Sequence, residues 1–294
     1  QQVVDMDVWI IINPLLKLAL YLASLGSVGS FLFSIHFRLQ LTQEQNLYCL
    51  QLSWKSALIG TISSVLLLFS IAGNLGGDFA SVIDFLMLKL AIQSKSGMSY
   101  LTVFAGFVIM LLTHKIKETA QKKTFLIGSV TVLFSFTLAG HAQFSGIFTQ
   151  FLLMLHLLGI AFWLGALLPF RWICLQSDVS NLSSLAHRFG VIAMVYVGLL
   201  LITGTAYAYT LLGKLSHIFT TTYGNVLLIK IVFVVSLLCL AAFNKFKAVP
   251  TLEKTPLQGL RQFKSSVQFE IVLALFILFA SSLLTTSLIV PIRM

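Results

Sequence analysis

Eight apolar runs divide the chain, and most of them approach the length of a helix that crosses a lipid bilayer. The runs lie near residues 9–33, 52–72, 100–114, 124–140, 148–172, 189–212, 224–243 and 267–290. A spanning helix needs about 20 apolar residues, because water is absent from the hydrocarbon and each backbone N–H and C=O must find a partner within the chain. Hydrophobic residues make up 58% of the sequence and charged residues only 10%, which is too apolar for a soluble fold. We therefore predict an all-α integral membrane protein with about eight transmembrane helices in one bundle.

Most connections between the runs are too short for a separate domain, with one exception at residues 76–96. That segment combines Asp, Ser and Lys with apolar residues such as Phe79, Phe85 and Leu90. A helix with one polar and one apolar face lies flat at the surface of a membrane. We expect an interfacial helix near residues 78–93.

The basic residues indicate how the bundle is oriented. The chain has 19 Lys and Arg against 9 Asp and Glu, a net charge of +10. They form short clusters between apolar runs instead of one patch, so membrane lipid is the expected surrounding and nucleic acid is not an expected partner. If the runs cross the membrane in turn, one side collects 13 of the 19 basic residues: Arg38, Lys55, Lys115, Lys117, Lys122, Lys123, Arg171, Arg188, Lys245, Lys247, Lys254, Arg261 and Lys264. Cytoplasmic loops carry such an excess, which predicts that both termini lie outside the cytoplasm.

Several catalytic signatures are missing from the sequence. It contains no Walker-type Gly-Lys-Ser/Thr loop, no HExxH and no CPC within a span, and its three cysteines form no CxxC pair. These absences argue against ATP hydrolysis, a P-type copper pump and a thiol-bound zinc site. We do not expect an enzyme, and any transport would be driven from elsewhere.

The two halves of the chain, residues 1–137 and 138–294, share a faint pattern. The run Leu16-Lys17-Leu18 with a later Leu-Gly pair aligns with Leu155-His156-Leu157 and its own Leu-Gly pair. Each segment would open a half of about four helices from the outer side. Leu and Gly are common in membrane helices, so both a duplication and a chance match remain open. In a true duplication, Lys17 would occupy the place of His156.

Two histidines are the leading candidates for metal binding. His156 lies about two turns into the fifth run and shares a helical face with Gly159 and Trp163. An ionisable group at this depth is expensive, so it is either bonded to a neighbouring helix or serves as a metal or haem ligand. His141 follows the fourth run and would meet His156 at the outer leaflet, unless it is simply a solvated residue at a helix end. Met154 offers a soft thioether that would suit Cu(I), although methionine also fills gaps in cores.

Four further polar residues indicate a polar seam through the bundle. Lys230 and Asn244 lie on the seventh run or just after it, and Glu270 opens the eighth. Lys230 either snorkels to the surface or supplies a charge within the bundle. Its depth differs from that of Glu270, so we expect Arg188, at the inner mouth of the sixth run, to be the nearer partner of Glu270.

The order of these motifs resembles the bacterial copper-resistance protein D family, CopD/PcoD. The resemblance covers about residue 138 to the end and is carried by Gly140-His141-Ala142, His156-Leu157-Leu158-Gly159, Phe162-Trp163-Leu164-Gly165, Arg188-Phe189, Thr203-Gly204, Tyr223-Gly224 with Lys230, Asn244, Glu270 and Thr285-Thr286. It implies a multi-pass protein of the bacterial inner membrane, with periplasmic termini, that moves copper from the periplasm beside a CopC-type copper-binding partner. Lys17 stands where a histidine would be expected, which weakens any symmetric two-histidine site.

Three functions follow from these residues. The first is a copper permease, in which His156 and His141 bind copper and the polar seam lets it pass. The second is a redox protein that holds a b-type haem between His141 and His156, although a second, deeper histidine pair is missing from the spans. The third is a scaffold that delivers copper to a partner without transporting it. Metal analysis and an absorption spectrum of the purified protein distinguish copper, haem and neither.

Overall fold

The fold is entirely helical over the residues that the structure describes, which are 8–113, 118–139, 146–176, 179–212 and 217–286 of a computed structural model. The helices are α1 (Trp9–His36), α2 (Gln43–Gly76), α3 (Phe85–Gln93), α4 (Lys95–Leu112), α5 (Glu118–Ser135), α6 (Gly146–Gly165), α7 (Leu167–Ile173), α8 (Val179–Leu212), α9 (His217–Thr220), α10 (Thr222–Phe243), α11 (Val249–Lys254) and α12 (Pro256–Thr286). A 3₁₀ turn, η1 (Ala80–Ile83), precedes α3, and a π-helical turn, η4 (Asn244–Ala248), joins α10 to α11. The predicted all-α membrane class is confirmed.

Seven stretches within the described residues are long and apolar enough to cross a membrane. They are Trp9–His36, Gln43–Gly76, Lys95–Leu112, Gly146–Ile173, Asn181–Thr210, Thr222–Lys254 and Pro256–Thr286. The fourth expected span corresponds to α5, which has 18 residues and carries Glu118, Lys122 and Lys123 near its start. Those charges shorten its apolar part, so the structure supports seven spans and leaves the eighth a prediction.

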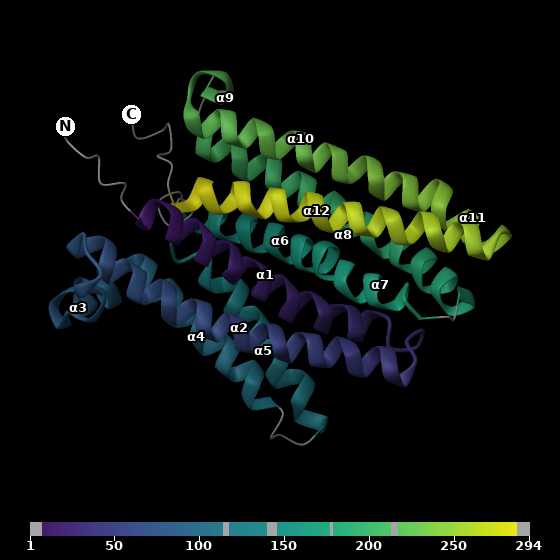
Figure 1. Ribbon diagram of the computed structural model, residues 1–294, viewed down its shortest axis with the longest axis horizontal. Helices are drawn as coiled ribbons and strands as arrows, with labels where there is room; N and C mark the ends of the chain where they lie inside the picture. The colour runs from purple at the N-terminus through teal and green to yellow at the C-terminus, as the bar shows by residue number, and fades with distance from the viewer. Residues whose placement is uncertain (1–7, 114–117, 140–145, 177–178, 213–216, 287–294) are drawn as a thin grey trace.

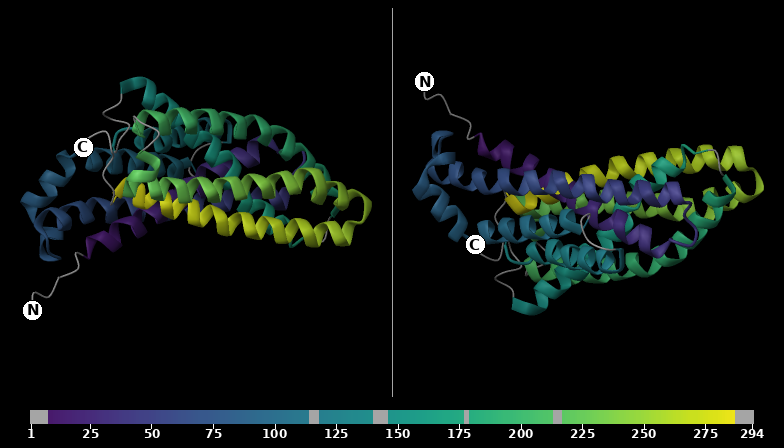
Figure 2. Two further views of the ribbon diagram at one scale, coloured as in Figure 1. Left: turned by 90° about the horizontal axis from the view of Figure 1, so that it is seen from above. Right: turned by 90° about the horizontal axis from the view of Figure 1, so that it is seen from below.

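α1 lies in the middle of the bundle (Figure 1). It packs against α2, α6 and α12. On one side, α2 packs against α4 and α4 against α5, while on the other side α6 packs against α8 and α10 against α12. Helix α1 begins, and α12 ends, at the end of the bundle that holds α3 and α9. We call this the α3 end, and the opposite end, where α11 lies, the α11 end; the perpendicular views show the same long axis (Figure 2).

A crossing of α1 and α6 brings the two halves into direct contact. A Cβ atom added at Gly165 would lie 2.5 Å from the Cα of Gly29 and 2.6 Å from the carbonyl oxygen of Leu25. Only glycine lets two helix backbones approach so closely, which is how small residues support packing inside membranes. The close contact fixes α6, and the histidine on it, against the central helix.

Two prolines account for the irregular turns near the α11 end. Proline has no N–H, and its ring collides with the carbonyl group four residues earlier. The ring of Pro169 would collide with the carbonyl group of Gly165, and α6 ends at Gly165 before α7 begins at Leu167. Pro250 likewise disturbs the carbonyl of Phe246, inside the wider π turn that starts at Asn244. Such turns change the direction in which neighbouring side chains point, and the π turn places Asn244 in the bundle interior.

The segment expected to lie in the interface folds into η1 and α3. Asp84 caps α3 by accepting a hydrogen bond from the backbone N–H of Met87 at 2.9 Å. Ile83 and Phe85 expose 80% and 82% of their surface at the α3 end. The position of this segment at a membrane surface stays a prediction. Before η1, the Asp78 carboxylate accepts hydrogen bonds from the Ser81 hydroxyl and backbone N–H, at 2.6 and 2.8 Å. These bonds hold the pKa of Asp78 below its ordinary value.

Candidate metal site and polar seam

His156 is held between α6 and α8 by a backbone hydrogen bond. Its Nδ1 lies 3.1 Å from the carbonyl oxygen of Leu200. A carbonyl oxygen can only accept, so Nδ1 carries the hydrogen and the Nε2 of the neutral ring keeps a free lone pair. Among the described residues, the bond of Nδ1 is the one hydrogen bond found for this ring. A ring fixed through one nitrogen and open at the other is the usual arrangement of a metal-binding histidine.

Two glycines make room for the ring. A Cβ atom added at Gly204 of α8 would lie 2.7 Å from Cε1 and 2.9 Å from Nδ1 of His156. A Cβ added at Gly159, one turn after His156, would lie 3.1 Å from both the Cβ of Leu200 and the carbonyl oxygen of Tyr196. The helices therefore close around the imidazole only because these positions lack side chains.

Trp163, which follows His156 by seven residues on α6, lies in the apolar core of the second half. It is buried in an apolar cluster with Leu200, Leu237 and Ile277, which belong to α8, α10 and α12. An aromatic side chain of this size contributes a large apolar contact area. Trp163 thus ties together the four long helices of the second half.

Lys230 lies within the span that α10 begins. The half-buried lysine is on α10, about 12 Å along the helix from Thr222. Among the described residues it forms no ion pair with a carboxylate. The sequence pattern left two alternatives open, snorkelling to the surface and a charge within the bundle, and both stay predictions.

The other two proposed ligands are Met154 and His141. Met154 is half-buried on α6, and no hydrogen bond joins it to His156 among the described residues. His141 lies outside the described residues, so its predicted meeting with His156 stays a prediction. In the described ranges, no cluster of three or more His, Cys, Asp or Glu side chains could hold a metal by itself.

Asn244 and Glu270 form a buried polar pair nearer the α11 end. Glu270 is 3% exposed, and Asn244 is 9% exposed. The Nδ2 of Asn244 donates a hydrogen bond of 2.6 Å to Oε1 of Glu270. The bonded partner of Glu270 is therefore Asn244 and not Arg188, since no ion pair joins Arg188 to Glu270 in the part of the chain that is described.

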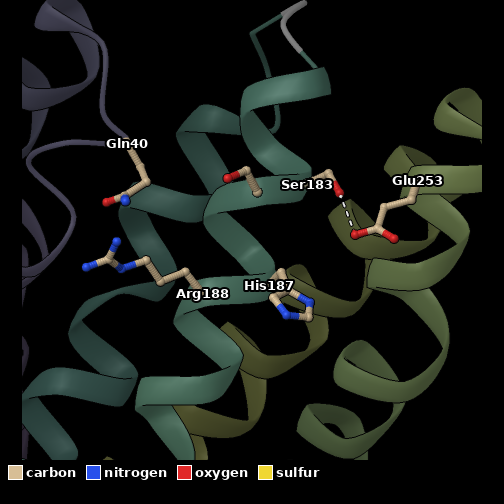
Figure 3. A pocket seen from close by; sticks show the side chains of 6 residues that line it. Gln40, Ser183, His187, Arg188 and Glu253 are labelled. Atoms are coloured by element: carbon tan, nitrogen blue, oxygen red, sulfur yellow. Dashed lines mark hydrogen bonds between the residues drawn. The ribbon is translucent and has the colours of Figure 1, made fainter.

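Arg188 instead lines an open pocket at the α11 end (Figure 3). The pocket has a volume of about 530 Å³ and is lined by Gln40, Ser183, Ser184, His187, Arg188 and Glu253. Arg188 points towards Gln40, while Ser183 donates a 3.4 Å hydrogen bond to Glu253 on the other side. Arg188 is exposed and belongs to the mouth of the bundle, not to its buried seam.

Lys17 lies in an aromatic cage that the sequence pattern did not predict. Its Nζ is 4.8 Å from the ring centre of Tyr100, 5.4 Å from that of Phe136 and 5.6 Å from that of Tyr21. Cations are attracted to aromatic ring faces at such distances. Tyr21, four residues after Lys17, was a signal in the sequence, whereas Tyr100 and Phe136 come from elsewhere in the chain.

These features define a multi-pass α-helical membrane protein with a few ionisable side chains enclosed by its spans. Two family models match it: copper resistance protein D over residues 183–284, and the copper resistance protein D-like N-terminal domain over residues 6–150. The chain belongs to the copper resistance protein D family, which confirms the resemblance and extends it to the first half. Lys230, Asn244 and Glu270 lie within the first match, while His156 lies between the two. No curated protein and no solved structure matches the chain.

Proposed function

We propose that this protein moves copper ions across the membrane through a site that contains His156. Family membership supports a role in copper resistance or handling. The observation that carries the proposal is the hydrogen bond from His156 Nδ1 to the Leu200 carbonyl, which leaves Nε2 free inside a span. Imidazole nitrogen is a good copper ligand, and a transported ion needs only a few ligands so that it can leave again.

The polar side chains suggest a route for the ion. Copper would bind at His156, with His141 and Met154 as proposed additional ligands, near the charge of Lys230. It would then pass towards Asn244 and Glu270 and leave near Arg188 at the α11 end. Buried ionisable groups mark ion pathways in membrane proteins because lipid does not tolerate them without a use.

The orientation belongs to the same proposal. The excess of Lys and Arg at the α11 end supports a cytoplasmic position for it, with both termini and the α3 end in the periplasm of a bacterial inner membrane. A CopC-type periplasmic protein would then deliver copper at the α3 end. The protein would bind copper as its transported substrate and not as a resident cofactor.

Copper uptake by proteoliposomes tests the proposal. We expect His156→Ala to abolish uptake while Gln51→Ala, which changes an exposed residue on α2 away from the proposed route, leaves the rate unchanged. Both variants should purify in normal yield, because His156 is held by one hydrogen bond and not by a buried network. Uptake at the wild-type rate by His156→Ala would refute the proposal.

An absorption spectrum of the same purified protein distinguishes the haem alternative. A Soret band that disappears in His156→Ala would assign the histidine to haem. Copper bound by the wild-type protein, without uptake into proteoliposomes, would favour the delivery scaffold.

A further inference from the structure

Glu270 lies in the bundle interior without a compensating charge. Its carboxyl group is 3% exposed, and its hydrogen-bond donor is the neutral amide of Asn244. Transfer of an unpaired carboxylate out of water costs several kcal/mol or more. The neutral acid avoids this cost, so the surroundings favour a bound proton.

The charged groups on α12 and on the helices packed against it form no ion pair with Glu270 within the described residues. On α7, Arg171 donates to Gln268 at 2.9 Å. In η4, Lys245 contacts Met194 and Lys247 lies over the ring of Phe243. None of the remaining titratable or charged groups on α1, α10, α11 and α12, within the described residues, makes an ion pair with Glu270: Lys17, Tyr21, His36, Tyr223, Lys230, Cys239, Glu253, Lys254, Arg261 and Lys264.

The partner amide also indicates a protonated acid. Asn244 donates through Nδ2, but its own Oδ1 is buried and has no hydrogen-bond partner in the structure. An ionised carboxylate has no hydrogen to offer to that oxygen. A protonated Glu270 does, and the acid and amide then exchange two hydrogen bonds, Nδ2–H to Oε1 and the carboxyl O–H to Oδ1. Buried acceptors are almost always satisfied in native proteins, so the orphaned Oδ1 favours the acid form.

A line of polar oxygens connects Glu270 to the α11 end. Ser266 and Gln262 precede it by one and two turns on the same face of α12. Among the described residues, Ser266 Oγ and Gln262 Oε1 are also buried without a hydrogen-bond partner. Both residues line a pocket of about 350 Å³ between α10 and α12, which Leu240 and Phe243 complete from the α10 side. The line covers about 12 Å, a distance that a few water molecules span.

On the face of α12 that carries Glu270, the next residues towards the α3 end are apolar. Ala274 and Ile277, one and two turns further towards the α3 end, are buried and apolar. A proton can therefore reach Glu270 from the α11 end but meets no polar group directly beyond it on this face of α12.

We propose that Glu270 is a proton-binding residue, loaded from the α11 end along Gln262 and Ser266 and held in its protonated form by Asn244. On release, the carboxyl O–H bond breaks and the proton passes to water in the pocket between α10 and α12 that Gln262 and Ser266 line. The carboxylate keeps one hydrogen bond from Asn244. In the copper transporter proposed above, on which this last step rests, the proton is the coupling ion.

Infrared difference spectroscopy of the protein in lipid, without copper, tests the proton site. We expect a carboxylic acid C=O band at neutral pH that disappears as the pH is raised. Glu270→Gln should remove the band, and the amide can still pair with Asn244, so this variant should remain folded. Asn244→Leu should shift the band, because the acid loses both hydrogen bonds. Glu44→Gln, which changes an exposed carboxylate at the start of α2, should leave it intact.

Two results would overturn the proposal. One is a protein without the band at any pH, or with a band that persists in Glu270→Gln. The other is loss of the band on addition of sodium ions at constant pH, which would make the oxygen cluster a metal-cation site instead.

Copper uptake under an imposed pH gradient tests the coupling separately. Wild-type uptake should change with the gradient, and Glu270→Gln should not respond. Uptake that ignores the gradient in the wild type would refute the coupling and leave the infrared result standing. Absence of any copper uptake would refute the proposed function, and the band would still decide the proton site.

Discussion

Replacement of Gly204 by alanine tests whether the imidazole of His156 is held as a ligand. The new Cβ would lie 2.7 Å from Cε1 and 2.9 Å from Nδ1 of the ring. Carbon atoms make comfortable contact from about 3.5 Å, so the ring must move away from α8 by about 0.8 Å. Leu200 is on α8 too, and its 3.1 Å bond to Nδ1 is already near the upper limit of about 3.2 Å for a good N–H···O bond. The shift therefore breaks the bond that orients the ring.

The expected consequence is a loss of copper affinity. Removal of the group that orients a metal-binding histidine typically costs about 10–100-fold in metal affinity. Thermal stability should change little, because alanine gains about 0.5–1 kcal/mol over glycine within a helix and the clash offsets that gain. A competition titration with a Cu(I) chelator, together with thermal unfolding in detergent, measures both quantities on one preparation.

Gly198→Ala is the matched control on the same helix. A Cβ atom there meets nothing within 4 Å, so the substitution has the helix benefit without the clash. It should raise stability by up to about 1 kcal/mol and leave copper affinity unchanged. Equal copper affinity in Gly204→Ala and Gly198→Ala would refute the reasoning, because the ring would then not be a ligand oriented by Leu200.

Three further predictions concern other parts of the molecule. Gly165→Ala should lower the free energy of unfolding by about 1–3 kcal/mol relative to Gly198→Ala, because the added methyl group meets the α1 backbone; equal melting temperatures would contradict this. Lys17→Met should match or exceed the wild-type melting temperature, since it removes a buried charge. Lys17→Glu should lower the melting temperature, because it places an anion against ring faces. A higher melting temperature for Lys17→Glu than for Lys17→Met would be evidence against the cage. Asp78 should titrate below the ordinary value of about 3.9 in carboxyl NMR, and Ser81→Ala should raise its pKa. Because the pKa of Asp78 is depressed, its ionised carboxylate stabilises the fold at pH values above the ordinary pKa. This contribution disappears as the pH falls through the folded-state pKa. Destabilisation by Ser81→Ala at acidic pH alone would refute the prediction.

The sequence predicted the membrane class and the positions of the long helices. Seven of the eight expected spans correspond to helices of sufficient length and apolarity, although α2 and α12 extend beyond the expected boundaries. The helices continue past the membrane-length run because backbone hydrogen bonding does not stop where polar residues begin, as the capping box of Thr42 and Gln45 at the start of α2 shows.

The candidate site was predicted only in part. An ionisable residue within an apolar run is visible in the sequence, so His156, Lys230 and Glu270 could all be selected. The residues that contact them could not be selected from the sequence. Arg188 was the expected partner of Glu270 by depth, whereas the π turn at Asn244 brings an amide into that place. Neither Ser266 nor Gln262 was selected, although their four-residue spacing from Glu270 was a signal.

Composition and periodicity thus determined that this chain enters a membrane as helices and which few polar residues it encloses. Burial of apolar side chains is additive along the sequence, so a one-dimensional pattern suffices for it. The tertiary structure alone decided that a carbonyl on α8 orients His156, that three rings surround Lys17, and that Asn244 meets Glu270. Those contacts join helices far apart in the chain, and they depend on rotations and close approaches that glycines and a π turn set locally.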